Sequence, residues 1–264
     1  MKDEKTKLTL VKVGGKIVEE PASLQRLLAD FAAIPGRKVL VHGGGRSATQ
    51  LAERLGMESR MVNGRRITDA EMLRVVTMVY GGLVNKTIVA GLQALGVDAI
   101  GLTGADMNLI RSVRRPAGEV DYGYVGDVTH VRADLLASLI EQGAVPVLAP
   151  LTHDGQGILL NTNADTIAGE TAKALARRFD VSLVYCFEKK GVLRQADDDD
   201  SVIPSLDRPT FDTYVRRGII QGGMIPKLEN AFAAVEAGVK QVVITCATAI
   251  DGTQGTHIQT PQQP

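Results

Sequence analysis

The chain has 264 residues, of which 44% are hydrophobic, enough for one large α/β domain or two coupled lobes with a sizeable core. Its 30 lysine and arginine residues balance 30 aspartate and glutamate residues without a strongly basic stripe, so nucleic acid is not an expected partner. The two cysteines form no CxxC pair, which argues against a disulfide framework or a structural zinc site and favours a cytoplasmic setting.

The hydropathy of the chain predicts no membrane partner. Residues 1–7 are polar and charged, unlike a secretory signal peptide. No run of about 18 apolar residues occurs, so we expect no membrane span.

Short apolar segments alternate with helical patterns through most of the chain. The predicted strands cover residues 8–13, 38–42, 97–102, 144–150, 182–186 and 241–245. The predicted helices cover residues 23–31, 47–55, a stretch from 68 onward, 133–141, 164–179, 207–217 and 224–236. Extended segments and hairpins are expected at 58–68 and 113–129. This alternation predicts an α/β fold with a mostly parallel central sheet and helices on both faces.

Two boundaries follow from the same reading. Thr68, with Glu71 three residues later, forms a capping-box signature that predicts Thr68 as the N-cap of a helix. A lobe boundary is expected just before the strand at 182, giving an N-terminal lobe of residues 1–180 and a C-terminal lobe of residues 181–264.

Glycine clusters follow the first two predicted strands. Gly14 and Gly15 end the first strand, and residues 43–45 end the second and lead into a helix. Ligands of parallel sheets bind beyond the carboxyl ends of the strands, where glycine N–H groups and a helix N-terminus can hold an anion. A tight turn without a ligand would use the same residues. Lys12 precedes the first pair, and it either snorkels from an edge strand or points at phosphate oxygens.

Three short segments resemble known motifs, but the surrounding residues argue against each match. Residues 43–48 resemble a dinucleotide-binding fingerprint, but no acidic residue near position 63 would bind a ribose. Residues 42–45 also resemble an esterase oxyanion-hole motif, but the chain has no GxSxG nucleophile. Lys86 and Thr87 resemble part of a Walker A motif, but Asn85 stands before them and the segment is helical.

Two further clusters place charge at helix starts. Gly222 and Gly223 lead into a helix that has Pro226 and Lys227 in its first turn. In residues 160–165, asparagines at a strand-to-helix junction are typical of helix caps, and Asp165 follows in the first turn. Each cluster alone is equally compatible with ordinary capping or a surface lysine. Together they suggest a carboxylate that organises two lysines.

The clusters occur together, in this order and spacing, in one known group of proteins. The motifs are Lys12-Val-Gly-Gly15, His42-Gly-Gly-Gly45, Asn63-Gly-Arg-Arg-Ile-Thr68, Asn161-Thr-Asn-Ala-Asp165, Gly222-Gly-Met-Ile-Pro-Lys227 and Gly255-Thr-His-Ile258. Over nearly its whole length the chain resembles the N-acetylglutamate kinases, a branch of the amino acid kinase family. The resemblance implies an open αβα sandwich that transfers the γ-phosphate of ATP, bound with Mg²⁺, to the side-chain carboxylate of an N-acyl-L-glutamate in arginine biosynthesis.

The resemblance also implies roles for particular residues. Lys12 and Lys227 would stabilise the transferring phosphoryl group, and Asp165 would hold both lysines in place. The backbone N–H groups of Gly15, Gly44 and Gly45 would face the phosphates and the attacking carboxylate. Arg66 and Asn161 would bind the α-carboxylate of the substrate. The nucleotide site would comprise Lys12, Gly14, Gly15, Glu188 and Lys227, with no protein metal site. The N-terminal lobe would bind the acylated amino acid and form a homodimer contact, and the C-terminal lobe would bind the nucleotide.

The sequence departs from the family pattern in two places. A Thr/Ser-Asp pair usually ends the strand before the nucleotide loop, whereas residues 185–191 read Tyr-Cys-Phe-Glu-Lys-Lys-Gly here. Either Glu188 takes the acidic role, or the nucleotide is held differently. Lys12 lies so near the start that the long N-terminal helix of arginine-inhibited relatives is not expected, which favours a homodimer without arginine feedback.

Other readings remain open from the sequence alone. The substrate could be N-succinylglutamate or a different acid, and a catalytically inactive sensor is a further alternative. His130, His153 and His257 lack metal-ligand spacing and are read as structural or exposed. Residues 197–200, four consecutive aspartates, are read as a solvated loop. Residues 122 and 124, both tyrosines, either border the acyl group or pair across a hairpin.

Overall fold

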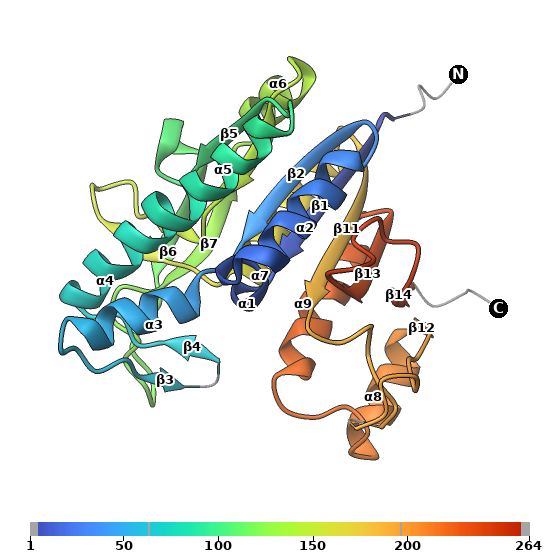
Figure 1. Ribbon diagram of the computed structural model, residues 1–264. Helices are drawn as coiled ribbons and strands as arrows, with labels where there is room; N and C mark the ends of the chain where they lie inside the picture. Colours follow the sequence, from blue (N-terminus) through green and yellow to red (C-terminus); the bar gives the residue numbers. More distant parts are fainter. Residues whose placement is uncertain (1–4, 63, 196, 260–264) are drawn as a thin grey trace.

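The computed structural model describes residues 5–62, 64–195 and 197–259. The chain folds around a central eight-stranded sheet with the order β12-β14-β13-β11-β1-β2-β8-β5 (Figure 1). The strands are β1 (Lys7–Val13), β2 (Arg37–His42), β5 (Ala99–Leu102), β8 (Val145–Leu148), β11 (Asp180–Phe187), β12 (Ser205–Leu206), β13 (Gln241–Cys246) and β14 (Thr256–Ile258). All neighbouring pairs are parallel except β13 with β14. The predicted fold class and the mostly parallel sheet are confirmed.

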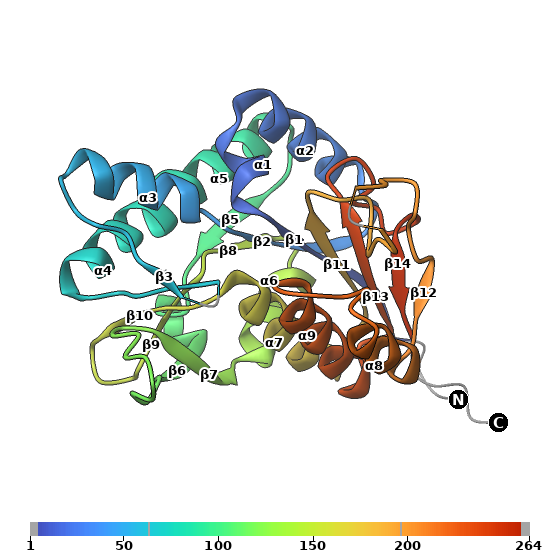
Figure 2. The ribbon, with the colours of Figure 1, turned by 90° about the horizontal axis from the view of Figure 1, so that it is seen from below.

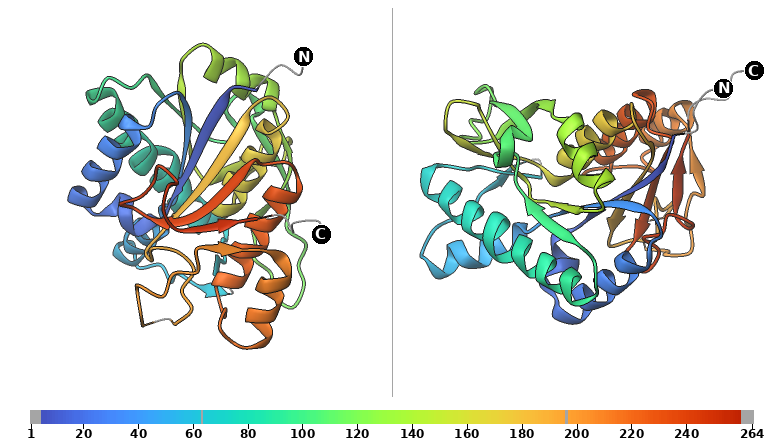
Figure 3. Two further views of the ribbon diagram at one scale, coloured as in Figure 1. Left: turned by 90° about the vertical axis from the view of Figure 1, so that its right-hand side faces the viewer. Right: turned by 90° about the horizontal axis from the view of Figure 1, so that it is seen from above.

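Helices cover both faces of this sheet, so the molecule has three layers (Figures 2 and 3). One face carries α1 (Gly15–Glu19), α2 (Pro21–Ala33), α3 (Gly45–Arg54), α4 (Ala70–Val76) and α5 (Asn85–Ala94). The other face carries α6 (Ala133–Glu141), α7 (Ala164–Leu175), α8 (Arg208–Arg216) and α9 (Met224–Glu236). Each layer has its own apolar core against the sheet, because the central strands are buried on both faces.

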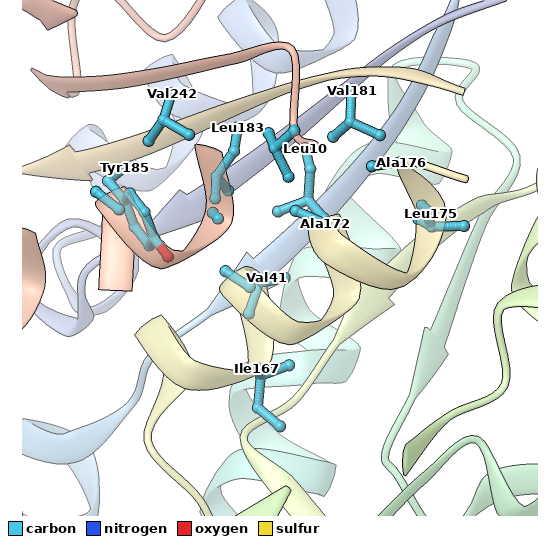
Figure 4. Close-up of a cluster of buried hydrophobic side chains, with 14 of the residues drawn as sticks. Leu10, Val41, Ile167, Ala172, Leu175, Ala176, Val181, Leu183, Tyr185 and Val242 are labelled. Carbon is cyan, nitrogen blue, oxygen red and sulfur yellow. The ribbon is translucent and has the colours of Figure 1, made fainter. Parts of the chain in front are cut away.

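The core on the α7 side fixes the position of that helix against the sheet. Figure 4 shows Ile167 and Ala172 of α7 facing strand residues that include Leu10 and Val41. Tyr185 of β11 belongs to the same cluster, and its hydroxyl donates a hydrogen bond of 3.2 Å to the backbone oxygen of Asp165. The start of α7 is therefore tied directly to the middle of the sheet.

A second, mostly antiparallel sheet lies beside the first, in the order β10-β9-β6-β7. Its strands are β6 (Ile110–Arg114), β7 (Gly126–Val131), β9 (Leu151–His153) and β10 (Leu159–Asn161), with a short 3₁₀ helix, η2 (Asp106–Asn108), before β6. The expected hairpin of residues 113–129 corresponds to the β6–β7 pair. A small ribbon, β3 (Met61–Val62) with β4 (Arg65–Arg66), occupies the other region predicted to be extended, and Asn63 between them lies outside the described residues.

The predicted N-cap at Thr68 is wrong. Helix α4 begins one residue later, and Asp69 is its N-cap, accepting a hydrogen bond of 2.8 Å from the backbone N–H of Met72. The Thr68 hydroxyl is engaged elsewhere: it donates to the backbone oxygen of Arg66 and accepts from the side-chain amide of Asn161. A contact between distant parts of the sequence thus takes the threonine away from the local capping role.

The helical stretch that follows is continuous over Ala70–Ala94, with a π-helical segment, η1 (Thr77–Val84), between α4 and α5. Its length and apolar composition alone would suit a membrane span, although the sequence lacks an unbroken apolar run of that length. Its buried side chains, including Val79, Ile88 and Leu92, belong to the core of the α2–α5 layer. This packing explains the apolar composition of the helix.

Candidate active site

The two glycine turns lie in backbone contact at the carboxyl ends of β1 and β2. The N–H of Gly43 donates a hydrogen bond of 3.0 Å to the backbone oxygen of Val13. A Cβ atom on Gly43 would lie 3.0 Å from the nitrogen of Gly15, and one on Gly15 would lie 3.4 Å from the nitrogens of Gly44 and Gly45. A side chain at Gly43 would therefore push against the first turn, whereas one at Gly15 would only reach ordinary contact distance, so close backbone approach favours glycine at position 43.

Helix α3 starts directly on this glycine floor. Gly44 is its N-cap and offers no side-chain cap, so the first backbone N–H groups depend on other partners. The carboxylate of Glu19 accepts a hydrogen bond of 2.7 Å from the N–H of Ser47. The N-terminus of α3, with its partial positive charge, therefore sits at the turn where an anion is expected.

Lys12 and Asp165 form a buried ion pair above the glycine floor. Lys12 Nζ lies 2.6 Å from Asp165 Oδ1, and their side chains are 8% and 11% exposed. Asn163 caps α7 by accepting hydrogen bonds from the N–H groups of Asp165 and Thr166, as its position in the sequence predicted. The cap fixes the first turn of α7, and that turn carries Asp165 toward the end of β1.

Lys227 lies in the first turn of α9, and its side chain reaches the region of the Lys12–Asp165 pair. Burial lowers its pKa below 10.5, and the charge of Lys12 lowers it further, while Asp165 and Glu188 partly offset these effects. The Nζ atoms of Lys12 and Lys227 lie 4.8 Å and 3.7 Å from the ring centroid of Phe187. The two ammonium groups therefore converge on one aromatic ring.

Both lysines line a cavity of about 800 Å³ between the glycine turns and α9. The cationic, acidic and glycine residues on its wall include Lys12, Gly14, Gly15, Lys16, Gly45, Arg46, Glu53, Arg66, Glu188, Lys189 and Lys227. Cations and backbone N–H groups on one wall are suited to a polyanion such as a nucleotide phosphate chain.

Glu188 lines this cavity without contacting the two convergent lysines through an ion pair. Its carboxylate oxygens lie 3.3 Å from Lys16 Nζ and 3.4 Å from Arg46 Nη2, and all three side chains are more than half exposed. The family resemblance had not singled out Lys16 or Arg46. Neither residue is part of a recognisable sequence motif. Their position beside Glu188 depends on the fold.

A smaller cavity, of about 170 Å³, adjoins the glycine floor on the side of the second sheet. Arg66 and Asn161 line it together with Gly44, Gly45 and Tyr80. The guanidinium of Arg66 is buried and hydrogen-bonded to Ser59, Thr49 and the backbone oxygen of Gly45. Its Nε has no hydrogen-bond partner among the residues that the structure describes. The polar groups of this cavity therefore lie next to the second glycine turn.

Arg65 is a further cation that sequence reasoning did not single out. It lines the small cavity and also a third cavity of about 550 Å³ that contains Asp165 and Lys227. Burial, and then the charge of Arg115, lowers the pKa of the Arg65 guanidinium. Its place within the Asn63–Thr68 motif was visible in the sequence, but its direction depends on the β3–β4 ribbon.

His42 is buried beneath the site, and burial lowers its pKa to about 4. Its ring contacts the side-chain amide of Asn85 at 3.1 Å. The histidine is therefore neutral at physiological pH and supports the second glycine turn. His130, His153 and His257 do not line any of the cavities described above, in agreement with their structural reading.

The tyrosines and aspartates left open from the sequence have identifiable neighbours. Arg114 lies over the ring of Tyr124 and Arg115 over that of Tyr122. Asp199 and Asp200 pair with Lys189 and Lys190 on the surface. Within the part of the chain that the structure describes, no group of three or more histidine, cysteine, aspartate or glutamate side chains could hold a metal ion.

The fold and the convergent lysines over glycine-lined strand ends are those of a phosphoryl-transfer enzyme. The chain belongs to the Amino acid kinase family, which it matches over residues 7–246. It is 73% identical to the acetylglutamate kinase of Bacteroides thetaiotaomicron over 253 residues, covering 96% of this chain and 98% of the relative. It is 72% identical to the acetylglutamate kinase of Phocaeicola vulgatus, covering 97% and 99%.

Among solved structures, the fold matches smu.665 from Streptococcus mutans UA159 with a TM-score of 0.79 and 29% sequence identity. The match covers 96% of this chain and 98% of that chain. The resemblance inferred from the sequence motifs is thereby confirmed at the level of the family and of its acetylglutamate kinase members.

Proposed function

We propose that this protein transfers the γ-phosphate of ATP to the side-chain carboxylate of N-acetyl-L-glutamate, a step of arginine biosynthesis. The convergence of Lys12 and Lys227 on one cavity wall, above the glycine turns, is the observation that carries the proposal. The activity named for relatives at 72–73% identity supports it.

The proposed chemistry needs charge stabilisation more than proton transfer. A carboxylate nucleophile is already ionised at neutral pH, so no catalytic base is required. Phosphoryl transfer then depends on in-line positioning and on cations near the developing charge. Lys12 and Lys227 supply those cations. Asp165 keeps Lys12 in place through the ion pair of 2.6 Å and attracts Lys227 electrostatically.

The remaining site residues bind and orient the two substrates. The N–H groups of Gly15, Gly44 and Gly45 would donate to the phosphates and to the attacking carboxylate. Arg66 and Asn161, on the wall of the smaller cavity, would hold the α-carboxylate of the amino acid. The nucleotide phosphates would occupy the larger cavity, against Lys12, Gly14, Gly15, Glu188 and Lys227.

The residues of the larger cavity fit a Mg²⁺ ion that arrives with the nucleotide. Mg²⁺ usually keeps several waters and binds phosphates plus one or two carboxylates. Glu53 and Glu188 are the carboxylates on the cavity wall and would hold the ion together with the phosphate oxygens. Bound Mg²⁺ would neutralise phosphate charge, and the protein supplies the two ammonium groups beside it.

We also propose that the two substrates bind to different lobes, formed by residues 1–180 and 181–264. The boundary coincides with the start of β11, and the smaller cavity is lined only by residues before it. The larger cavity combines residues from both sides. We place the amino acid on the N-terminal side and the nucleotide against the C-terminal side, in a cytoplasmic enzyme.

A homodimer through the N-terminal lobe is part of the proposal. Met78 and Leu83 of the π-helical segment are 55% and 63% exposed, and Ile158, directly before β10, is 45% exposed. Met78 and Ile158 line one apolar groove, which a second copy of the chain would cover. Light scattering of the wild type and of Met78→Glu checks this; a wild-type monomer would contradict it.

The function is tested by ADP release with MgATP and a panel of acids, with hydroxylamine trapping of the acyl phosphate. N-acetyl-L-glutamate is the expected substrate, and N-succinyl-L-glutamate, L-glutamate and L-aspartate are the competitors. The Lys227→Ala variant is the matched control for contaminating kinases. Turnover of another acid in preference to N-acetyl-L-glutamate, or no trapped product at all, would contradict the proposed substrate.

A further inference from the structure

Phe187 is an aromatic residue on the wall of the larger cavity. It is the last residue of β11, is 9% exposed, and lines the larger cavity at the end of the strand. The Tyr185 ring stacks parallel to it, with centroids 5.9 Å apart and an interplanar angle of 2°. The stacking on Tyr185, which is buried in the core, therefore restricts the orientation of the Phe187 ring.

The ammonium groups of two lysines make cation–π contacts with this ring. Lys227 Nζ lies 3.7 Å from the ring centroid and Lys12 Nζ lies 4.8 Å from it. Both distances are within the range of about 6 Å in which a cation is attracted by the negative face of an aromatic ring. The same side chain thus contacts both of the cations that the proposed reaction requires.

The two lysines differ in their other partners. Lys12 has the carboxylate of Asp165 at 2.6 Å. Among the described residues, no carboxylate oxygen lies within ion-pair distance of Lys227, and no hydrogen bond to its ammonium group is found. The Phe187 ring is its close electrostatic partner. Lys227 is half-buried, and Asp165 offsets part of its desolvation without an ion pair, so the ring is the direct favourable contact of its ammonium group.

An aromatic ring differs from a carboxylate in one respect that suits the reaction. It attracts the cation without neutralising its charge, so the full charge remains available to phosphate oxygens. We propose that Phe187 is a positioning residue, which holds the ammonium groups of Lys12 and Lys227 close to its ring and so prepares them for the transferring phosphoryl group. This inference rests on the proposed function and adds to it.

The test replaces Phe187 with mono-, di- and trifluorophenylalanine, which withdraw electron density from the ring at nearly constant size. The expected result is a stepwise fall in kcat, about threefold for the trifluoro residue, since exposed to partly buried cation–π contacts have modest strength. Phe187→Leu, which keeps an apolar side chain without a ring, should lower kcat about tenfold. The same fluorinated residues at Phe211, the buried aromatic residue of α8, should leave kcat unchanged.

A second measurement does not depend on turnover. The ring stabilises the protonated form of Lys227, so fluorination should lower the pKa of Lys227 further, as followed by NMR of ¹³C-labelled lysine. The charged groups that also act on Lys227 are Lys12 of β1, Asp165 of α7 and Glu188 after β11, and all are unchanged in the series. A role confined to packing would leave this pKa constant.

The outcomes separate the inference from the function on which it rests. An active wild type whose kcat and Lys227 pKa do not respond to fluorination overturns the role of Phe187 and leaves the proposed function standing. A wild type without kinase activity overturns the proposed function. In that case, a pKa of Lys227 that falls stepwise with the number of fluorine atoms still supports the cation–π contact. If Phe187→Leu fails to fold, as judged by circular dichroism, the size-preserving fluorinated series still decides.

Discussion

Replacing Asp165 with asparagine tests the buried ion pair that organises the site. The change keeps the shape of the side chain and removes the charge that faces Lys12 at 2.6 Å. Removing one member of a buried pair costs about 3–5 kcal/mol, because the remaining charge stays buried without its partner. Lys12 also contacts the Phe187 ring and borders an open cavity, so we expect the lower end, about 3 kcal/mol, in the free energy of unfolding.

The assay is a double-mutant cycle of Asp165→Asn and Lys12→Met, followed by urea unfolding and by kcat. Groups that act as one unit give non-additive effects, with coupling of about 0.5–3 kcal/mol. The double variant should therefore unfold less easily than the sum of the single changes predicts, and both single variants should lose most of their turnover. The exposed pair Lys190 and Asp200 is the matched control and should show no measurable coupling. Additive changes at the buried pair would refute the reasoning.

Four further expectations concern single residues. Lys227→Ala should lower kcat about 10²–10³-fold, the loss of about 2.7–4 kcal/mol found when one donor to a developing charge is removed; near-normal turnover would remove its role. Lys12→Arg should also fail in the kcat assay, because a flat guanidinium does not replace an ammonium in a crowded glycine turn. Arg66→Ala should chiefly raise the KM for the acylated amino acid, and an unchanged KM would exclude Arg66 from that subsite. The pH profile of kcat/KM for MgATP should fall on its alkaline side at a pH below 10.5, because burial lowers the pKa of Lys227 and only its protonated form carries the charge; the limb should disappear in Lys227→Ala.

Much of the fold could be predicted because its strands and helices carry strong local signals. Strand β1 and helix α9 matched their apolar patterns, and α6 coincided with the predicted residues 133–141. The glycine turns were predicted from residue type alone, and the close backbone contact at Gly43 leaves little room for a Cβ atom there. These features depend on neighbours within a few residues.

The errors and omissions depend on contacts between distant segments. The capping-box signature predicted Thr68 as the cap, but its hydroxyl accepts a hydrogen bond from Asn161 and the neighbouring Asp69 caps the helix instead. Glu188 was expected in the nucleotide site, but its pairing with Lys16 and Arg46 could not be predicted, because these residues are distant from it in the sequence. Phe187 carried no signal, because an aromatic residue at the end of an apolar strand normally indicates core packing.

The pairing of β1 with β11 has a mechanical consequence. Seven consecutive residue pairs, from Lys7 with Asp180 to Val13 with Cys186, join the strand that carries Lys12 to the strand that leads to Phe187 and Glu188. A hinge between the halves of the molecule would have to break this ladder. Any adjustment to incoming substrates must therefore come from a change in sheet twist or from movement of the surrounding helices and loops, with the floor of the site staying in one piece.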